Sequence, residues 1–234
     1  MTQTEITGTL DRTALEVIQE LKDNGYPINV IYDIGANDSR WYKLWKPRLK
    51  DATFFLFEGN PDNVCKAKLQ DDEHYYNVLL SYQNDLEVTF YTPDDYKVEN
   101  TGASYYRENT PHYKEGKNSR ILITKTLDSF AKDLPLPDFI KLDTQGSEVD
   151  IIKGATKALK HAKAVLCEMP IMPYNSGAPK FSEYIDTFYD HGFIPSGVDH
   201  LAIRKGVFNQ TDIIFVKKEI VQEIHDYKQK YSGF

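Results

Sequence analysis

The stretch INVIYDIGANDSR, residues 28–40, decides the fold class. Its first seven residues are largely apolar and rich in β-branched side chains, a pattern typical of a strand buried on both faces of a parallel sheet. Gly35 follows at once, and glycine permits the tight turn that leads from such a strand into a helix. The stretch therefore predicts the first strand–turn–helix unit of an open α/β sheet.

The alternation of strand and helix continues along the chain. Further strands are predicted at residues 54–58, 76–81, 86–91, 121–127, 138–143, 164–169, 201–205 and 212–218. Helices are predicted at residues 11–24, 40–50, 61–70, 149–161, 181–192 and 219–231. Strands that alternate with helices indicate a mostly parallel, doubly wound sheet with right-handed crossovers and helices on both faces.

One domain is expected for a chain of 234 residues, because α/β domains often reach this length. Within it, residues 1–27 are interpreted as an N-terminal helical extension and residues 219–234 as a C-terminal helical tail. Residues 92–120 show no regular pattern and are interpreted as an insertion. This insertion either closes over a ligand as a lid or covers the edge of the domain.

Composition limits the classes of partner. A net charge of −7 gives no sign of the basic surface that nucleic-acid-binding proteins usually present, so no nucleic-acid partner is predicted. Cys65 and Cys167 stand far apart in the sequence, as expected of reduced thiols in a cytoplasmic protein rather than of a disulfide framework. No run approaches the ~20 apolar residues of a membrane span. The sequence leaves the oligomeric state open.

Acidic side chains mark the ends of two predicted strands, where open α/β sheets bind their ligands. Asp33 lies beside the Gly35 turn, where its carboxylate would bind an amino group directly or through water. Glu58 ends the next strand, 25 residues further on, where a carboxylate accepts hydrogen bonds from ribose hydroxyls. Each feature alone also fits an ordinary strand end. Together they indicate an adenosine-type ligand, and Ser81, which ends another predicted strand, is included in the same site.

The loop after the first strand separates two classes of nucleotide ligand. A dinucleotide site needs the pattern G-x-G-x-x-G, so that a pyrophosphate rests on the helix N-terminus. The loop here reads GANDSR, with a single glycine, and Asp38 would repel a pyrophosphate. S-adenosylmethionine carries an amino group and a sulfonium but no phosphate. The loop therefore favours S-adenosylmethionine over NAD.

Two later strands end in carboxylates that are candidates for the chemical step. Asp143 precedes Gly146 at the end of one strand, and Glu168 ends the next. An alcohol that accepts a methyl group loses its proton, so a nearby carboxylate serves as general base. Asp143 is assigned to both the catalytic and the cofactor-binding set. A divalent metal held by Asp143 and Glu168 is an alternative, although two carboxylates form no recognisable metal motif.

Three further side chains are weaker candidates. Glu148 either belongs to the site or caps the helix that follows it, where a negative charge is favoured. His112 and His200 are alternative bases, but a lone histidine is more often structural or exposed.

Six blocks of the sequence resemble the FkbM family of methyltransferases. They read VIYDIGAND (30–38), FLFEGNPDN (55–63), TLDSF (126–130), DFIKLDTQGSEVDIIKGA (138–155), LCEMPIMPYNSGAPKFSEYIDTFYDHGF (166–193) and TDIIFVKK (211–218). The resemblance implies a class I methyltransferase fold with a seven-stranded sheet. It also implies S-adenosylmethionine as cofactor and O-methylation of a hydroxyl on a sugar, a glycan or a small natural product.

By the same resemblance, Asp33, Gly35 and Asn37 match the family's cofactor loop, and Glu58 matches its ribose carboxylate. The chain departs from the pattern at Ser39, where the family often has glycine. It departs again at Gln145, where glutamate is common.

The acceptor site is predicted in the region that resembles the family least. Residues 92–120 include Tyr96, Tyr105, Tyr106 and Tyr113, whose rings and hydroxyls suit a sugar. Residues 173–181 are expected to share that site. Two other classes stay open: an NAD-type oxidoreductase, and a nucleotide-binding module on the same fold without catalysis.

Overall fold

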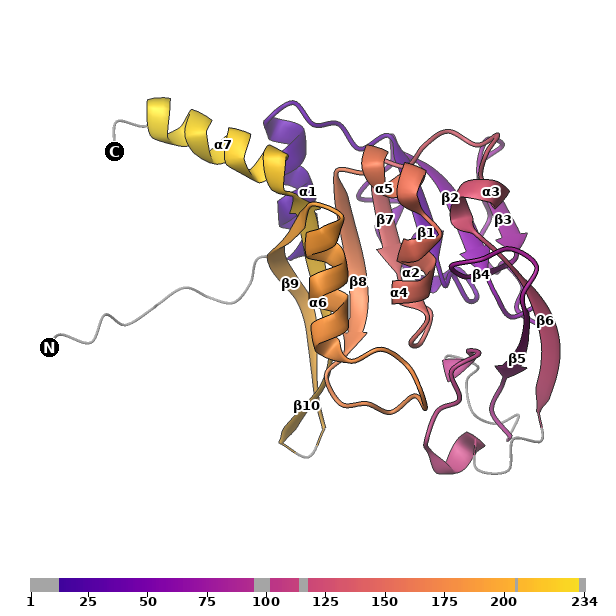
Figure 1. Ribbon diagram of the computed structural model, residues 1–234. Coiled ribbons are helices and arrows are strands. Elements are labelled where there is room, and N and C mark those ends of the chain that lie inside the picture. Colours follow the sequence, from indigo (N-terminus) through magenta and orange to yellow (C-terminus); the bar gives the residue numbers. More distant parts are fainter. Residues whose placement is uncertain (1–12, 95–101, 114–117, 205, 232–234) are drawn as a thin grey trace, which may run out of the picture.

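A seven-stranded sheet forms the centre of the computed structural model (Figure 1), which describes residues 13–94, 102–113, 118–204 and 206–231. The order of its strands is β3 (His74–Asn77), β2 (Thr53–Glu58), β1 (Val30–Ile34), β7 (Phe139–Leu142), β8 (Ala164–Pro170), β10 (Val207–Lys217) and β9 (Phe193–Arg204). The first five are parallel to one another, whereas β10 is antiparallel to both β8 and β9. The predicted mostly parallel, doubly wound sheet is confirmed.

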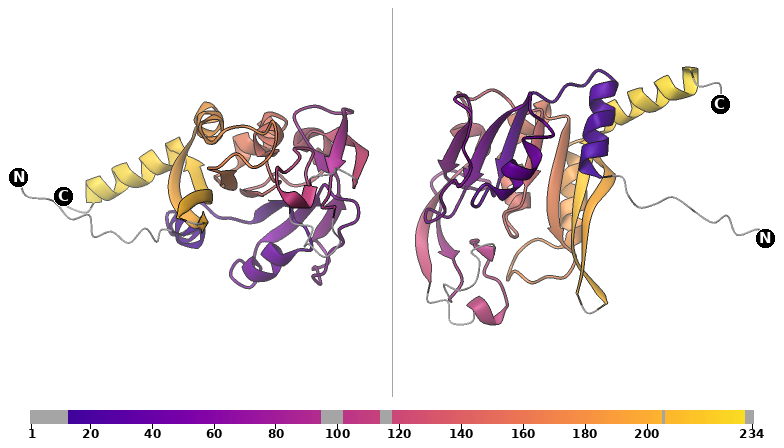
Figure 2. Two further views of the ribbon diagram at one scale, coloured as in Figure 1. Left: turned by 90° about the horizontal axis from the view of Figure 1, so that it is seen from below. Right: turned by 180° about the vertical axis from the view of Figure 1, so that it is seen from behind.

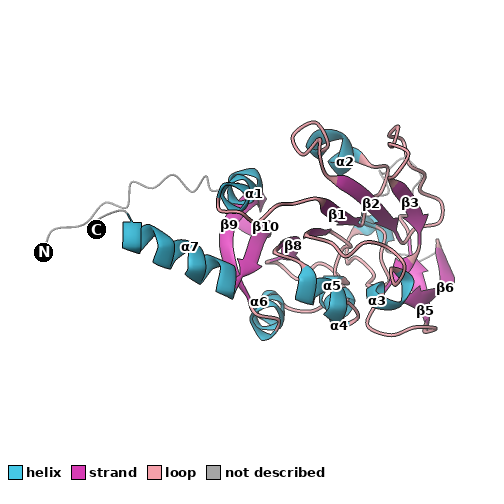
Figure 3. Ribbon diagram, turned by 90° about the horizontal axis from the view of Figure 1, so that it is seen from above, coloured by secondary structure: helices cyan, strands magenta, loops and turns pink. Residues whose placement is uncertain are grey.

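Helices cover both faces of the sheet (Figure 3). One face carries α1 (Ala14–Asp23) and α2 (Arg40–Trp45), whose apolar side chains pack on β1 and β2. The other carries α3 (Leu127–Phe130), α4 (Glu148–Lys153), α5 (Thr156–His161) and α6 (Phe181–Asp190). The central strands lie between the two layers, and β7 and β2 are buried along almost their whole length. This burial explains why they read as continuous apolar runs in the sequence.

A helix lies near each end of the described chain, within the ranges predicted at 11–24 and 219–231. The helix α1 begins with a capping box, in which the Thr13 side chain accepts from the Glu16 backbone and the Glu16 side chain accepts from the Thr13 backbone. It lies beside the β9–β10 hairpin (Figure 2). The last helix, α7, spans Lys218–Tyr231. Among the described residues, no helix is long and apolar enough to cross a membrane.

A second, three-stranded sheet has the order β4 (Leu79–Leu80), β6 (Ser119–Lys125) and β5 (Glu87–Tyr91). The sequence predicted one strand over residues 76–81. The structure instead divides this stretch at Val78, so that its first part pairs with β2 and its second part with β6. The second sheet therefore starts where the edge of the main sheet ends.

Besides the strand predicted at 76–81, three predicted elements differ in type or extent from the structure. Residues 61–70 form turns and irregular chain instead of a helix, although Pro61 suits a first helical turn. The helix predicted at 149–161 is two helices separated at Gly154. A Cβ there would lie 2.3 Å from the Ser81 carbonyl oxygen, so the chain approaches Ser81 more closely than another residue allows. Of the strand predicted at 201–205, residues 201–204 form the end of the twelve-residue β9, and residue 205 lies outside the described residues.

The described part of the predicted insertion lies across the carboxyl ends of the central strands (Figure 1). It contains the short 3-10 helix η2 (Pro111–Tyr113) and packs against the loop that follows β8. The Asn109 amide donates to the Tyr174 carbonyl at 2.6 Å, and the Ser176 amide donates to the Arg107 carbonyl at 2.8 Å. We call residues 102–113 together with 174–178 the roof. Tyr96 and Thr101 lie outside the described residues.

Candidate active site

A cavity of about 530 Å³ opens between the roof and the carboxyl ends of β1, β2, β7 and β8. Its volume is in the range of small-molecule sites, and its position is where open α/β sheets bind ligands. We call the strand ends and the turns that follow them the floor. Of the residues predicted for the site, the cavity is lined by Gly35, Asn37, Glu58, Asp143 and Glu168.

The turn after β1 is fixed by the backbone. Gly35 has φ +81°, and Asn37 and Ser39 have φ +46° and +68°. The Gly35 and Ala36 amides both donate to the Phe57 carbonyl, at 2.9 and 3.0 Å. A Cβ on Gly35 would lie 1.7 Å from the Asp143 carbonyl oxygen. Only glycine therefore fits where the first loop meets the second, and Ser39 occupies a conformation that favours glycine.

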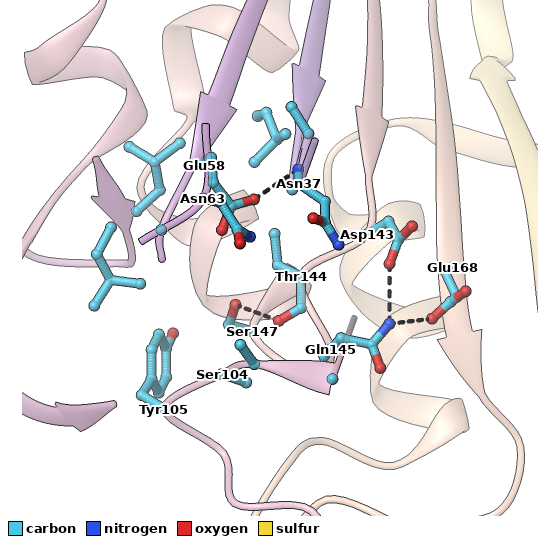
Figure 4. A pocket seen from close by; sticks show the side chains of 18 of the residues that line it. Asn37, Glu58, Asn63, Ser104, Tyr105, Asp143, Thr144, Gln145, Ser147 and Glu168 are labelled. Atoms are coloured by element: carbon cyan, nitrogen blue, oxygen red, sulfur yellow. Dashed lines mark hydrogen bonds between the residues drawn. The ribbon is translucent and has the colours of Figure 1, made fainter. Parts of the chain in front are cut away.

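Glu58 binds the same turn from the end of β2 (Figure 4). Its Oε2 accepts from the Asn37 amide and its Oε1 from the Asn60 amide, both at 2.7 Å. Burial raises the pKa of this carboxyl, and the two backbone donors oppose that rise. Each oxygen has a second lone pair for another donor. The carboxylate is thus held at the cavity wall with accepting capacity to spare.

Asp33 lies beneath the cavity instead of lining it. It is fully buried, and the described residues offer neither of its oxygens a hydrogen bond of normal geometry. Burial raises its pKa, whereas the Lys141 ammonium, 3.5 Å from Oδ1, lowers it. The predicted direct contact between Asp33 and an amino group stays a prediction.

Asp143 and Glu168 are brought together by a glutamine (Figure 4). The Gln145 amide nitrogen donates to Asp143 Oδ1 at 3.0 Å and to Glu168 Oε1 at 2.7 Å. The Gln210 amide nitrogen donates to Glu168 Oε2 at 2.7 Å. Gln145 has φ +58°, so this departure from the family pattern lies in a turn of unusual conformation and joins the two candidate bases.

The electrostatic field around Glu168 favours a bound proton. Burial and the charges of Asp143, Asp212 and Glu148 raise its pKa well above the ordinary value, against a smaller opposing effect from Lys141. A carboxyl with such a raised pKa keeps a proton that an exposed carboxyl would release. In the described part of the chain, no three His, Cys, Asp or Glu side chains are grouped so as to hold a metal ion.

Glu148 fixes the turn that follows β7. It is buried, and its carboxylate accepts from the Thr144 amide at 2.6 Å, the Gly146 amide at 3.0 Å and the Tyr184 hydroxyl at 2.7 Å. Its carboxylate therefore fixes the turn that presents Asp143. It does not line the cavity.

The remaining candidates divide between the cavity and the rest of the molecule. Ser81 does not line the cavity, and its hydroxyl lies 3.2 Å from that of Tyr105. His112 lines the cavity from the roof, while His200 is exposed on β9 and does not. Asp38, expected to repel a pyrophosphate, pairs with Lys66 at 3.1 Å and Arg40 at 3.3 Å. These two cations partly offset the negative charge of Asp38, so it would repel a pyrophosphate less than the sequence suggested.

The family follows from residues 33–195, which match the methyltransferase FkbM domain. The matched range is more than half of the chain. This protein belongs to the FkbM methyltransferase family. The membership confirms the predicted family and agrees with the class I methyltransferase arrangement of the sheet. S-adenosylmethionine is the methyl donor that such a methyltransferase implies.

One relative with an assigned substrate has low sequence identity to this chain. The hexuronic acid methyltransferase AglP of Haloferax volcanii is 23% identical over 162 residues, which are 66% of this chain and 61% of that protein. The chain therefore spans less than two thirds of the length of that relative.

Solved structures of methyltransferases resemble this fold loosely. Magnesium protoporphyrin IX methyltransferase from Synechocystis PCC 6803 with bound SAH has a TM-score of 0.46 at 10% identity, over 86% of this chain and 80% of that one. The precorrin-6y C5,15-methyltransferase of Geobacter metallireducens GS-15 has a TM-score of 0.41 at 13% identity, over 93% of each chain. Because both scores are below 0.5, the family match decides the assignment.

Reasoning from the sequence missed two groups of residues in this FkbM methyltransferase. Lys141 stands in the middle of a buried strand, and its ammonium reaches the cavity between Asp33 and Asp143. A lysine within the apolar run DFIKLD was the available signal, because lysine is almost never buried without a partner. Asn209 and Gln210 line the cavity from β10 and gave no signal, since polar residues near a hairpin are ordinary.

Proposed function

We propose that the cavity binds S-adenosylmethionine and that the protein transfers its methyl group to a hydroxyl of a sugar, a glycan or a small natural product. The observation that carries the proposal is the Glu58 carboxylate, which two backbone amides fix at the cavity wall. A carboxylate has about four acceptor positions, more than these two amides and the Asn63 side chain use. Such an acceptor suits the paired hydroxyls of a ribose. Asn37 and Gly35 line the wall beside it.

The proposed chemical step needs a positioned acceptor and a base. The acceptor oxygen forms a bond to the methyl carbon while the bond from that carbon to the sulfonium sulfur breaks, and the hydroxyl proton passes to a carboxylate. Asp143 and Glu168 line the same wall and share Gln145 as a donor. Asp143 is therefore proposed as the base that takes this proton, with Glu168 holding the Gln145 amide in place beside it. Holding the oxygen in line supplies much of the remaining rate enhancement.

The proposed acceptor contacts lie in the roof. The Thr110 and Tyr113 hydroxyls are buried without a hydrogen-bond partner among the described residues, and both residues line the cavity. Buried polar groups normally have partners, so these hydroxyls suit a ligand that carries hydroxyls of its own. Tyr174, which also belongs to the roof, lines the cavity as well. The sugar methyltransferase AglP supports the choice of a sugar, at an identity too low to fix its kind.

The experiment measures S-adenosylmethionine binding by titration calorimetry. Glu58→Ala is expected to weaken binding more than tenfold, which corresponds to the ~1.5–3 kcal/mol of charge-assisted hydrogen bonds. Asp71→Asn, an exposed carboxylate outside the cavity, is the control and should leave affinity unchanged. Unchanged affinity in Glu58→Ala would remove Glu58 from the site.

Measurements on the same purified protein distinguish two other functions. NAD in place of S-adenosylmethionine would raise the melting temperature if the protein were an oxidoreductase, since a ligand that binds the native state stabilises it. A binding module without catalysis would bind S-adenosylmethionine but methylate none of a panel of glycosides. A cytoplasmic location and the absence of a nucleic-acid partner stay predictions.

A further inference from the structure

Lys141 is a buried cation in the middle of a strand whose four residues are all buried. On β7 it stands directly opposite Asp33 of β1, its partner in the parallel register. Replacing a buried ion pair with apolar side chains of similar size is often neutral or even stabilising. Stability of the sheet therefore does not explain why a lysine occupies this position.

The Lys141 ammonium has a different acceptor in each of three directions. It lies 3.1 Å from Asp143 Oδ2, donates to the Gly35 carbonyl at 3.2 Å and lies 3.5 Å from Asp33 Oδ1. An ammonium has three donors; here Asp143 and Gly35 are close enough for hydrogen bonds, and Asp33 is a more distant ion-pair partner. Gly35 belongs to the first loop of the floor and Asp143 to the second.

The contacts coincide with the point where the two loops touch. Gly35 and Asp143 approach so closely that a Cβ on Gly35 would overlap the Asp143 carbonyl. The ammonium lies beside this backbone contact and fixes one polar group from each loop. Both loops line the cavity, Gly35 on the side of Glu58 and Asp143 on the side of Glu168.

The charge of Lys141 is set by its surroundings. Burial alone would lower its pKa, but the carboxylates of Asp143 and Asp33, and more weakly Glu168, raise it above the ordinary value. These carboxylates therefore favour the charged form of the lysine. Asp33, which lies outside the cavity, then serves as its counterion.

We propose that Lys141 is a positioning residue, which clamps the Gly35 loop to the Asp143 loop and so holds the methyl-donor site in its binding geometry. Asp33 is the counterion of this clamp. The inference rests on the proposed function, because it assigns Lys141 a part in the S-adenosylmethionine site.

A double replacement tests the clamp without leaving a buried unpaired charge. Asp33→Asn/Lys141→Met removes both members of the ion pair, so it is expected to keep a melting temperature within a few degrees of the wild type. Without the ammonium, the Gly35 carbonyl and the Asp143 carboxylate lose the donor that they share. S-adenosylmethionine affinity is therefore expected to fall at least tenfold. The single variant Asp33→Asn retains the ammonium, so the difference in affinity between this variant and the double variant is the part of the loss that belongs to Lys141, and it is expected to be severalfold or more.

Another lysine–aspartate pair provides the matched control. Lys163 lies 2.6 Å from Asp138 at the opposite end of β7, and neither residue lines the cavity. The variant Asp138→Asn/Lys163→Met is expected to leave S-adenosylmethionine affinity within twofold of the wild type, even if its melting temperature falls.

The results separate this inference from the function on which it rests. Failure of the wild type to bind S-adenosylmethionine overturns the proposed function itself. If the wild type binds and the Asp33/Lys141 double variant binds equally well, Lys141 is no clamp. If Asp33→Asn alone shows the whole loss, the contact belongs to Asp33 and the assignment to Lys141 is wrong. An equal loss in the Asp138/Lys163 control would show that any buried pair in the sheet matters as much.

Discussion

The floor and the roof of the cavity are held in place by different means. In the floor, three consecutive features are set by the main chain: the turn at Gly35, the backbone donors to Glu58, and the contact of Gly35 with the Asp143 carbonyl. In the roof, side chains supplement the two main-chain hydrogen bonds between residues 107–109 and 174–176. Tyr105 and Tyr106 both donate to one oxygen of Asp150, at 3.0 and 2.7 Å. The Asn175 amide nitrogen also donates to the Tyr106 carbonyl at 2.7 Å.

The difference indicates where the molecule tolerates change. A wall built from main-chain contacts keeps one shape and suits a ligand that is always the same, as a methyl donor is. A wall built from side chains on loops changes shape when single residues change, and binding residues often lie on such loops. We therefore expect replacements in the floor to affect the methyl donor, and replacements in the roof to affect the acceptor or only the stability.

The largest effect is expected at Gly35. Gly35→Ala places a methyl group 1.7 Å from a backbone oxygen, so either the fold or the first loop must change, and S-adenosylmethionine binding should be lost. Gly25→Ala is the matched control, because Gly25 has a similar φ of +85° but no atom within 4 Å of the added Cβ. It should cost about 1 kcal/mol from backbone strain alone. Melting curves and calorimetry measure both. Wild-type affinity in Gly35→Ala would contradict the description of the floor.

A smaller effect, on turnover, is expected at Asp143. Asp143→Asn keeps the size of the side chain, and its amide oxygen still accepts from Lys141, so donor affinity should change little. Turnover should fall by ~10²-fold, the usual scale for a lost general base. Methyl transfer to a glycoside found by screening provides the measurement. Asp138→Asn, at the other end of β7, should leave turnover unchanged. Full activity of Asp143→Asn at saturating acceptor would exclude it as the base.

In the roof, loss of the Tyr105 or Tyr106 hydroxyl should affect stability, whereas loss of the Tyr113 hydroxyl should affect acceptor binding. Tyr105→Phe and Tyr106→Phe each remove a donor to the buried Asp150, so each should lower stability by about 1–3 kcal/mol and leave acceptor kinetics unchanged. Tyr113→Phe removes a hydroxyl without a partner among the described residues. It should leave stability unchanged and raise the KM for the acceptor severalfold. If Tyr105→Phe and Tyr106→Phe alter that KM instead, the acceptor contacts lie at this pair, as the sequence first indicated.

How far the sequence predicted the molecule depends on the range of the interactions. The strands, the Gly35 turn, and the acidic residues Glu58, Asp143 and Glu168 follow from local patterns, and the structure brings the latter three to one cavity. The break at Gly154 follows from an approach to Ser81, 73 residues away in the chain, which no local pattern records. The roof likewise joins residues 102–113 to 174–178 through contacts between distant loops. Lys141 was missed because its role depends on Asp33, a residue on another strand.

The smallest effect concerns the acidic charge behind the floor. Asp212 lies on β10 opposite Glu168 of β8, and its Oδ1 is buried without a hydrogen bond among the described residues. Burial, together with the charge of Asp143, raises the pKa of Asp212 to about 7, against an opposing effect of Lys141. The folded protein thus binds this proton more tightly than the unfolded chain does. The stabilisation from the bound proton is complete below the unfolded pKa of about 4 and is lost as pH rises through about 7.

Asp212→Asn tests this dependence, because asparagine resembles the protonated acid at every pH. At pH 4 the wild type and the variant should differ little in melting temperature, and the advantage of the variant should grow as pH rises from 4 to 7. At pH 8 the variant should be the more stable by about 1 kcal/mol or more, since it does not ionise a buried carboxyl. Asp186→Asn, at an exposed carboxyl on α6, provides the surface control. If Asp212→Asn is equally or less stable at pH 8, then the charge behind the floor is neutralised by groups other than Lys141. The repulsion between the carboxylates around Glu168 and Asp212 would then be weaker than their raised pKa values imply.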